Sequence, residues 1–577
     1  MKNLFLVVVA LVLLSLMVGC GSPSTEVAGE SPAYWPTDGW RVSTPEKQGM
    51  DSELLAGALT LLAEQDDYGI HSLLIIRNGY IVTDAYFYPF AEETMHNTFS
   101  VTKSITATLI GIALDQGHIE GVEQPVLEFF PEKTVANLDV SKQAMTLKDL
   151  LTMQTGFDFI SKPEDTMWEM TLTADDWVQF TLDLPMQEEP GAFFAYCSPG
   201  SHLLSAVVQQ TTGMSALDFA SEYLFGPLGI SDVGWPSDPH GITHGYGDLH
   251  LSPHDMAKIG YLYLNSGSWG GQQIVPAEWV TAATKAHVNF GDNRGYYGSQ
   301  ESGNGYGYQW WIKPEYYSAV GHGGQYIHVS PDRNLVVVLT GGGGLTGVVD
   351  EVLSSYVFPA VKSDGPLPAN PDSVASLEHL TQSLSTPPPA EPKDVPPLPE
   401  IAHKISGKTY QLDANPFGLL SIRLTFNEQD EALLKITSSG VLTLGDIKYE
   451  WLIGMDNVER FSPGTLDIPV AGKGSWETGS YFSAQIDETG SANTWQIGLH
   501  FKGDEVICRL QNLSEAVREY PKFVGRLREG PVVTPDSLEP GETSVETRPS
   551  VTVKNSSPPR TPGKPGWWVI SVREGPS

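Results

Sequence analysis

The stretch Thr98-Phe99-Ser100-Val101-Thr102-Lys103-Ser104 decides what fold and chemistry to expect of this chain. It opens a mostly apolar run over residues 101–116, which predicts a buried helix that stops at Gly117. On such a helix Lys103 lies on the same face as Ser100, one turn further on. A serine hydroxyl is a poor nucleophile at neutral pH, but a lysine amine that desolvation keeps neutral can take its proton. The spacing therefore predicts a nucleophile beside its own base; a helix N-cap serine followed by a solvated lysine is the alternative.

The segments on either side of this helix predict an antiparallel sheet. Apolar runs at 72–76 and 80–87 flank Arg77-Asn78-Gly79, and Asn-Gly between two such runs indicates a β-hairpin. Two more strands, joined by a turn, are expected within residues 326–339. The chain between these strands has a largely helical pattern. Residues 40–362 are therefore predicted to form an α+β domain, an antiparallel sheet flanked by helices with a mainly helical insert.

The rest of the chain divides by composition. Residues 363–400 predict a linker, and their second half is dense in proline and semi-rigid. Residues 401–526 alternate apolar and polar side chains in short runs between Gly, Asn and Asp turns, which predicts an all-β module, either a barrel or a sandwich. Residues 527–577 are rich in Pro, Ser, Thr and Gly and predict a disordered tail.

The N-terminus has the pattern of an export signal. Lys2 precedes an apolar run that ends in Leu16-Met17-Val18-Gly19-Cys20. Small residues before a cysteine resemble a bacterial lipobox, which implies that residues 1–19 are a signal peptide and that Cys20 carries a lipid. Residues 20–39 would then be a tether, and the protein would sit on the extracytoplasmic face of the cell membrane. An ordinary cleaved signal or an uncleaved anchor helix is the alternative.

Composition argues against some functions. The chain carries 69 acidic and 34 basic side chains, a formal net charge of −35, which argues against nucleic-acid binding. The three cysteines are Cys20, Cys197 and Cys508, so lipidation of the first leaves at most one disulfide. No C-x-x-C or H-E-x-x-H motif occurs, and the 14 histidines lack compact ligand spacing. We therefore expect no metal and no cofactor.

Two later motifs accompany the first in order along the chain. They are Phe194-Ala195-Tyr196-Cys197-Ser198 and Gly321-His322-Gly323-Gly324-Gln325. Together the three resemble the penicillin-recognising serine hydrolases, the β-lactamase/transpeptidase-like family, in their class C branch. That branch includes esterases, D-alanyl-D-alanine peptidases and 6-aminohexanoate-dimer hydrolase. The resemblance covers roughly residues 40–360, with supporting matches at 146–153, 224–230, 251–257 and 304–311.

The resemblance implies roles for the first two motifs. Ser100 is the acylated nucleophile and Lys103 its base or proton relay. Tyr196 fills the place of the family's tyrosine, and we expect the nearby lysine to lower the pKa of its phenol so that it shuttles protons. Ser198 stands where the family commonly has asparagine, so it is expected to bind substrate or the lysine with a shorter reach. A cysteine nucleophile at Cys197 is the weaker alternative, because no base motif accompanies it.

The third motif bears on the substrate. His322 stands where β-lactamases have a lysine, so a permanent cation for a penicillin carboxylate is missing. The backbone N–H groups of Ser100 and Gln325 would form the oxyanion hole. Gly323 and Gly324 would allow the substrate to approach the backbone closely.

These expectations combine into one hypothesis. The chain is predicted to be an exported, lipid-anchored serine hydrolase that cleaves a small-molecule or peptide ester or amide through an acyl-enzyme on Ser100. A D-Ala-D-Ala carboxypeptidase or a β-lactamase is the alternative within this chemistry. A non-hydrolytic binder or sensor of cell-wall peptides is the alternative from another class.

Overall fold

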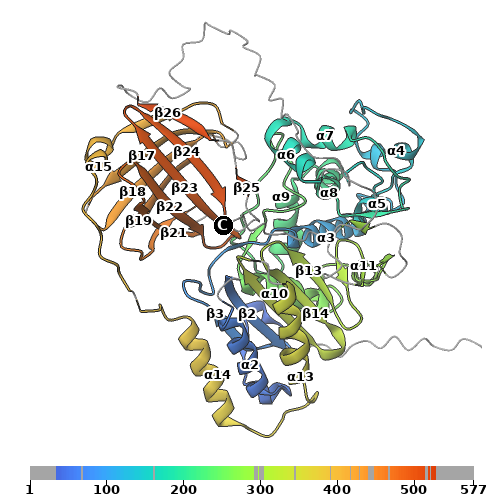
Figure 1. Ribbon diagram of the computed structural model, residues 1–577. Helices are drawn as coiled ribbons and strands as arrows, with labels where there is room; N and C mark the ends of the chain where they lie inside the picture. Colours follow the sequence, from blue (N-terminus) through green and yellow to red (C-terminus); the bar gives the residue numbers. More distant parts are fainter. Residues whose placement is uncertain are drawn as a thin grey trace, which may run out of the picture.

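The computed structural model consists of a mixed α/β domain and a β-barrel placed beside it (Figure 1). It describes residues 34–65, 69–159, 163–290, 296–297, 304–343, 346–389, 391–415, 417–427, 429–439, 447–464, 468–513, 518–519 and 522–527. The predicted signal peptide, Cys20 and the predicted tail beyond residue 527 lie outside these residues. Within the described parts, no helix combines the length and apolar character needed to cross a bilayer.

The domain is built on a nine-stranded sheet, as expected from the α+β pattern. Every neighbouring pair is antiparallel except β1–β3, so the sheet is mixed at one edge. Its order is β1 (Arg41–Val42), β3 (Tyr80–Tyr86), β2 (Ile70–Arg77), β15 (Leu335–Gly341), β14 (Gln325–Ser330), β13 (Tyr317–Gly321), β12 (Trp311–Ile312), β11 (Gly305–Tyr306) and β9 (Val288–Asn289). The predicted β2–β3 hairpin is confirmed, and Asn78 and Gly79 both have positive φ, 52° and 82°.

The central strands β2, β14 and β15 are buried at every position because both faces of the sheet are covered. Along β2, Leu74 and Ile76 pack into the core shared with α3 (Val101–Asp115) and α10 (Pro253–Leu264). Leu73 and Ile75 point to the other face and pack with Leu55 of α2 (Ser52–Ala63). Successive strand residues alternate between faces, so a strand covered on both sides is rich in apolar residues on both faces rather than alternating apolar and polar.

The predicted helix after Ser100 is confirmed as α3, which ends at Asp115 shortly before Gly117, whose φ is 78°. It is buried along nearly its whole length, between the sheet and a mainly helical insert. The helices of that insert are α4 (Val140–Ala144), α5 (Leu147–Leu151), α6 (Pro163–Thr173), α7 (Trp177–Asp183), α8 (Ser198–Thr212) and α9 (Ala216–Ala220). The insert thus supplies the wall that desolvates the N-terminal turns of α3.

The predicted linker contains a helix that the sequence analysis did not anticipate. Helix α14 (Pro371–Leu384) packs against α2 and β3, and Leu377 is only 4% exposed. Leu377, Leu380 and Leu384 join the core beneath α2. Their spacing of three and four residues is the signal that the high proline content of the region obscured.

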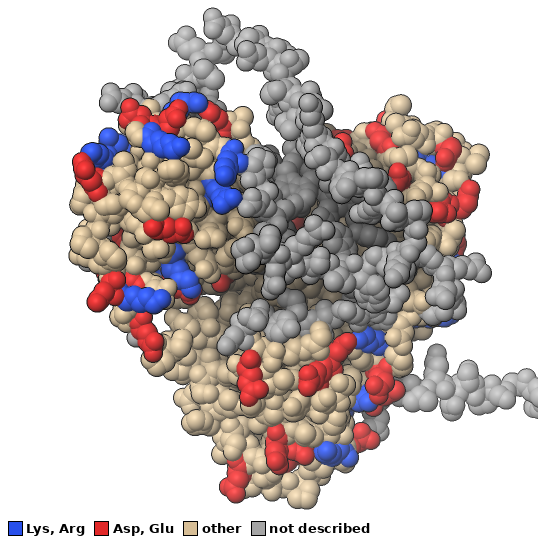
Figure 2. Space-filling model, viewed as in Figure 1, with Lys and Arg blue, Asp and Glu red and all other residues tan. Residues whose placement is uncertain are grey.

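The C-terminal module is a closed barrel, so the sequence-based choice between barrel and sandwich is resolved. Nine strands close through a pairing of Gly454 on β19 with Lys473 on β21. In barrel order they are β19 (Ile447–Gly454), β18 (Glu431–Ser438), β17 (Leu419–Phe426), β16 (Thr409–Leu412), β26 (Phe523–Leu527), β24 (Glu505–Asn512), β23 (Asn493–Lys502), β22 (Tyr481–Glu488) and β21 (Pro469–Trp476). On the face shown in Figure 2, acidic side chains are spread over the barrel and the α/β domain, and no continuous basic surface is visible there.

Candidate active site

Ser100 and Lys103 meet at the start of α3, as their spacing predicts. Ser100 is the N-cap residue, and Lys103 Nζ donates a 2.8 Å hydrogen bond to Ser100 Oγ. The preceding residue, Phe99, has a φ of 45°, and its backbone N–H is held by Asn97 Oδ1 at 2.9 Å. This sharp turn directs the serine side chain toward the lysine rather than toward its own helix N-terminus.

The Lys103 amine is desolvated. Its side chain is 1% exposed, and burial lowers the pKa of Lys103 to about 7, with the carboxylate of Asp248 acting in the opposite direction. A large share of the amine is therefore neutral at physiological pH. The condition that the sequence argument required, a neutral lysine next to the serine, is met in the structure.

Tyr196 joins this pair from the segment between β5 (Phe194–Ala195) and α8. Its ring lies 4.9 Å from Lys103 Nζ and stacks on Trp311 with centroids 5.8 Å apart. Burial raises the pKa of Tyr196 to about 12, and a hydrogen bond with Ser100 only partly offsets this. The expectation of a lowered phenol pKa is therefore wrong, because desolvation by burial is the largest influence on Tyr196 and outweighs its hydrogen bond with Ser100.

The third motif forms the turn between β13 and β14. Gly323 and Gly324 have φ of 75° and 97°, a conformation that favours glycine. A Cβ on Gly321 would lie 2.2 Å from the carbonyl oxygen of Thr98, so the turn is pressed against the segment that leads to Ser100. The exposed ring of His322 lies edge-on to Phe99, with centroids 5.5 Å apart. The structure thus brings all three motifs together.

The remaining predicted site residues lie around this centre. Gln325 begins β14, is fully buried, and its side-chain amide donates to the carbonyl of Gly341. Ser198 is the half-buried first residue of α8. Burial raises the pKa of the Cys197 thiol to about 12, which opposes a thiolate nucleophile there. Cys197 and Cys508 are both free and buried.

Sequence reasoning missed the loop that fixes the lysine. The backbone carbonyl of Tyr246 accepts a 2.7 Å hydrogen bond from Lys103 Nζ. Two residues later, Asp248 accepts from Asn97 Nδ2 at 3.2 Å and pairs with His244 Nδ1 at 2.9 Å. Asp248 therefore supports the Asn97 side chain that holds Phe99. The Lys103–Tyr246 and Asn97–Asp248 contacts join residues more than 140 positions apart, so they leave no local sequence signal.

Asp84, Glu92 and His254 form a group with metal-ligand atoms within 4.8 Å of one another. Both ring nitrogens of His254 already contact carboxylates, Nε2 to Asp84 at 3.0 Å and Nδ1 to Glu92 at 2.9 Å. Burial lowers the pKa of His254, but the two carboxylates outweigh it and the net change is upward. The geometry is that of an imidazolium between two carboxylates, and it includes no residue of the three motifs.

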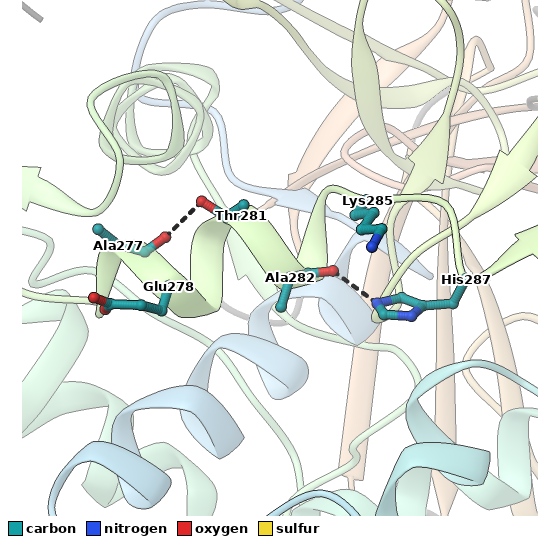
Figure 3. A pocket seen from close by; sticks show the side chains of 6 residues that line it. All are labelled: Ala277, Glu278, Thr281, Ala282, Lys285 and His287. Atoms are coloured by element: carbon teal, nitrogen blue, oxygen red, sulfur yellow. Dashed lines mark hydrogen bonds between the residues drawn. The ribbon is translucent and has the colours of Figure 1, made fainter. Parts of the chain in front are cut away.

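A surface pocket lies along α11 (Ala277–Ala283), and Figure 3 shows the side chains that line it. His287 Nε2 donates to the carbonyl of Ala282 at 2.9 Å, and its ring stacks on Tyr308. Thr281 donates to the carbonyl of Ala277. These polar groups are thus already used within the protein, and the pocket contains no motif residue.

Comparison with known proteins defines the class. Residues 58–344 match the family model described as Beta-lactamase. The chain is 24% identical to 6-aminohexanoate-dimer hydrolase of Paenarthrobacter ureafaciens over 311 residues, 51% of this chain and 79% of that protein. It is 23% identical to penicillin-binding protein 4 of Amycolatopsis lactamdurans over 292 residues, 44% of this chain and 73% of that protein.

Among solved structures, the octameric penicillin-binding protein homologue from Pyrococcus abyssi matches with 17% identity and a TM-score of 0.42, over 82% of this chain and 99% of that one. The α/β domain belongs to the β-lactamase/transpeptidase-like serine hydrolases. The protein is a β-lactamase-family hydrolase.

Proposed function

We propose that the protein cleaves an ester or amide bond through an acyl-enzyme on Ser100. The observation that carries this proposal is the 2.8 Å contact between Ser100 Oγ and a buried Lys103 amine whose pKa is about 7. As Oγ attacks the substrate carbonyl carbon, its proton passes to Lys103 Nζ. Such a base is most effective when its pKa lies near the working pH.

The remaining groups complete the reaction. The backbone N–H groups of Ser100 and Gln325 hold the tetrahedral oxyanion, and each such donor contributes about 3 kcal/mol. The Tyr196 phenol, kept protonated by burial, gives its proton to the leaving group and regains one from Lys103. Water then attacks the carbonyl carbon of the Ser100 ester. The proton of the water passes through Tyr196 and Lys103 to the departing Ser100 Oγ, and the acid is released.

The third motif supports a substrate without an obligatory carboxylate. His322 is exposed at the turn where β-lactamases carry lysine, so a permanent cation that would bind a penicillin carboxylate is missing there. The relative from Paenarthrobacter ureafaciens is named 6-aminohexanoate-dimer hydrolase. We therefore favour compact linear esters and amides over β-lactams, and D-Ala-D-Ala peptides are the second candidate.

A fluorophosphonate probe tests the nucleophile. The folded wild-type protein should be labelled, Ser100→Ala should not, and Ser376→Ala on the exposed face of α14 should label as wild type does. Release assays with p-nitrophenyl esters, anilides, β-lactams and a D-Ala-D-Ala peptide would then rank substrates. Absence of labelling in folded wild-type protein would favour the non-hydrolytic binder of cell-wall peptides.

We also propose that the protein is exported and anchored by a lipid on Cys20. The support is the sequence Leu16-Met17-Val18-Gly19-Cys20 after an apolar run. Metabolic labelling with a fatty acid should mark the wild-type protein in the membrane fraction, whereas Cys20→Ala should lose the label. Labelling that persists in Cys20→Ala would contradict the anchor.

A further inference from the structure

The turn between barrel strands β22 and β23, Thr489-Gly490-Ser491-Ala492, is buried. Thr489 is 4% and Ala492 1% exposed, although a hairpin turn at the end of a barrel ordinarily faces solvent. The carbonyl oxygen of Gly490 accepts a 2.8 Å hydrogen bond from the backbone N–H of Asn97. The barrel turn is therefore seated on the α/β domain three residues before Ser100.

The two domains approach so closely at this turn that neither Gly490 nor Gly323 has room for a side chain. A Cβ on Gly490 would lie 2.2 Å from the carbonyl oxygen of Met95, and a Cβ on Gly323 would lie 2.3 Å from Cβ of Ala492. The backbone of Gly490 has no positive φ, so its conformation does not call for glycine. The absence of a side chain at Gly490 is needed for the approach of the two domains.

The turn is held firmly by its own barrel. The Thr489 hydroxyl donates to the carbonyl of Pro469, and Asn493 Nδ2 donates to the Ser491 hydroxyl at 3.1 Å. The backbone N–H of Ser491 donates to the carbonyl of Glu488 at 2.9 Å. A turn fixed in this way does not yield easily to a ligand.

The turn touches both sides of the candidate site. On one side it meets Asn97, whose side chain fixes Phe99 and hence the position of Ser100. On the other side Ala492 covers Gly323, next to the exposed His322. The turn therefore borders both the segment that leads to Ser100 and the glycine turn that precedes Gln325.

We propose that the Thr489–Ala492 turn is a specificity-determining wall of the active-site cleft, which restricts the protein to substrates with a compact group beside Gly323. The proposal rests on the acyl-enzyme function above and adds to it a size limit imposed by the barrel. A pocket wall that differs by one methyl group typically changes discrimination by about tenfold or more. The barrel is then part of the substrate-binding site rather than a spacer.

Two variants of the full-length chain test the wall. Ala492→Gly removes the methyl group that faces Gly323 and leaves the Gly490–Asn97 hydrogen bond in place. Gly490→Ala forces a Cβ against the carbonyl of Met95 and so lifts the turn from its seat. Gly479→Ala is the matched control, because a Cβ there meets nothing within 4 Å in the turn before β22 of the same barrel.

The assay is kcat/KM for two series of esters, one that varies the acyl chain with a p-nitrophenyl leaving group and one that varies the alcohol. For Ala492→Gly and Gly490→Ala, we expect the ratio of kcat/KM for long substrates to kcat/KM for short ones to rise about tenfold in at least one series. For Gly479→Ala this ratio should stay at the wild-type value. Hydrogen exchange of the Asn97 amide should quicken in Gly490→Ala, which shows that the turn has moved in a folded protein.

Other outcomes overturn the proposal. An unchanged ratio in Ala492→Gly means that the turn does not limit substrate size. If kcat/KM falls by the same factor for every substrate, and fluorophosphonate labelling falls with it, the turn only supports the segment that carries Ser100. Failure of wild-type Ser100 to react with the fluorophosphonate refutes the proposed function itself, and this readout does not depend on the wall.

Discussion

Acylation of Ser100 should switch on as the pH rises through 7, because the reaction needs Lys103 in its neutral form. Burial lowers the pKa of Lys103 to about 7. At pH 7.5 about three quarters of such an amine is neutral, compared with about one part in a thousand for a lysine with an ordinary pKa near 10.4. Desolvation of this single side chain therefore raises the reactive fraction roughly 600-fold.

The perturbation that tests the cause is Asp248→Asn. The Asp248 carboxylate opposes the effect of burial and holds the pKa of Lys103 higher than burial alone would. The amide is close in shape and its oxygen can still accept from Asn97 Nδ2. Removing the negative charge should move the rise in activity to lower pH, by roughly one unit or less.

The assay is the second-order rate of fluorophosphonate inactivation between pH 5 and 10, which reports acylation without a product-release step. The wild-type rate should rise with a midpoint near 7 and reach a plateau by about pH 8.5. Lys103→Arg should be nearly inactive throughout, since a guanidinium stays protonated over this range. A wild-type midpoint near 10, or a midpoint that moves to higher pH in Asp248→Asn, would refute the reasoning.

Three further predictions concern single side chains. Tyr196→Phe keeps the ring stacked on Trp311 but removes the phenol hydroxyl. Anilide turnover should therefore fall by 10²–10⁴-fold, while acylation by p-nitrophenyl esters, whose leaving group needs no proton, falls much less. An equal loss for both substrates contradicts a role of Tyr196 in protonating the leaving group. His322→Lys restores a permanent cation and should raise labelling by a fluorescent penicillin relative to that by an uncharged fluorophosphonate, whereas no change argues against carboxylate binding at this turn. Burial lowers the pKa of His96 to about 4, so the unfolded chain binds more protons between pH 6.5 and 4 and stability is lost as the pH falls through that window. By pH 4.5 this lowers the free energy of unfolding by about 2.5 kcal/mol. In urea unfolding, the free energy of unfolding of His96→Asn should therefore decline less between pH 7 and 4.5 than that of the wild type. Equal declines in the two proteins contradict the role given to His96.

Much of the architecture follows from local patterns in the sequence. The apolar run after Ser100 made α3 a buried helix, and Asn78-Gly79 between two apolar runs made the β2–β3 hairpin. Alternation over residues 401–526 predicted strands, because one face of each barrel strand must be apolar. The choice of barrel over sandwich depended on the pairing of β19 with β21, which no local pattern encodes.

The candidate site was predictable as a set of residues but not as an electrostatic environment. Motif spacing placed Lys103 on the Ser100 face of a helix, and motif order suggested Tyr196 and His322 as partners. The pKa of Tyr196 was predicted with the wrong sign, because it depends on how much solvent the packed insert and Trp311 exclude. The Asp248–Asn97 contact was also invisible, since it joins distant parts of the chain.

By itself the sequence determined which side chains can react and which short segments form helices and strands, because those properties depend on residue type and on neighbours within a few positions. Only the tertiary structure decided that Lys103 is desolvated and that the Tyr246 carbonyl accepts a hydrogen bond from its amine. It also decided that Gly490 of the barrel contacts Asn97, three residues before the nucleophile. Burial and close approach are properties of surfaces brought together from distant parts of the chain, and they arise only when the whole chain has packed.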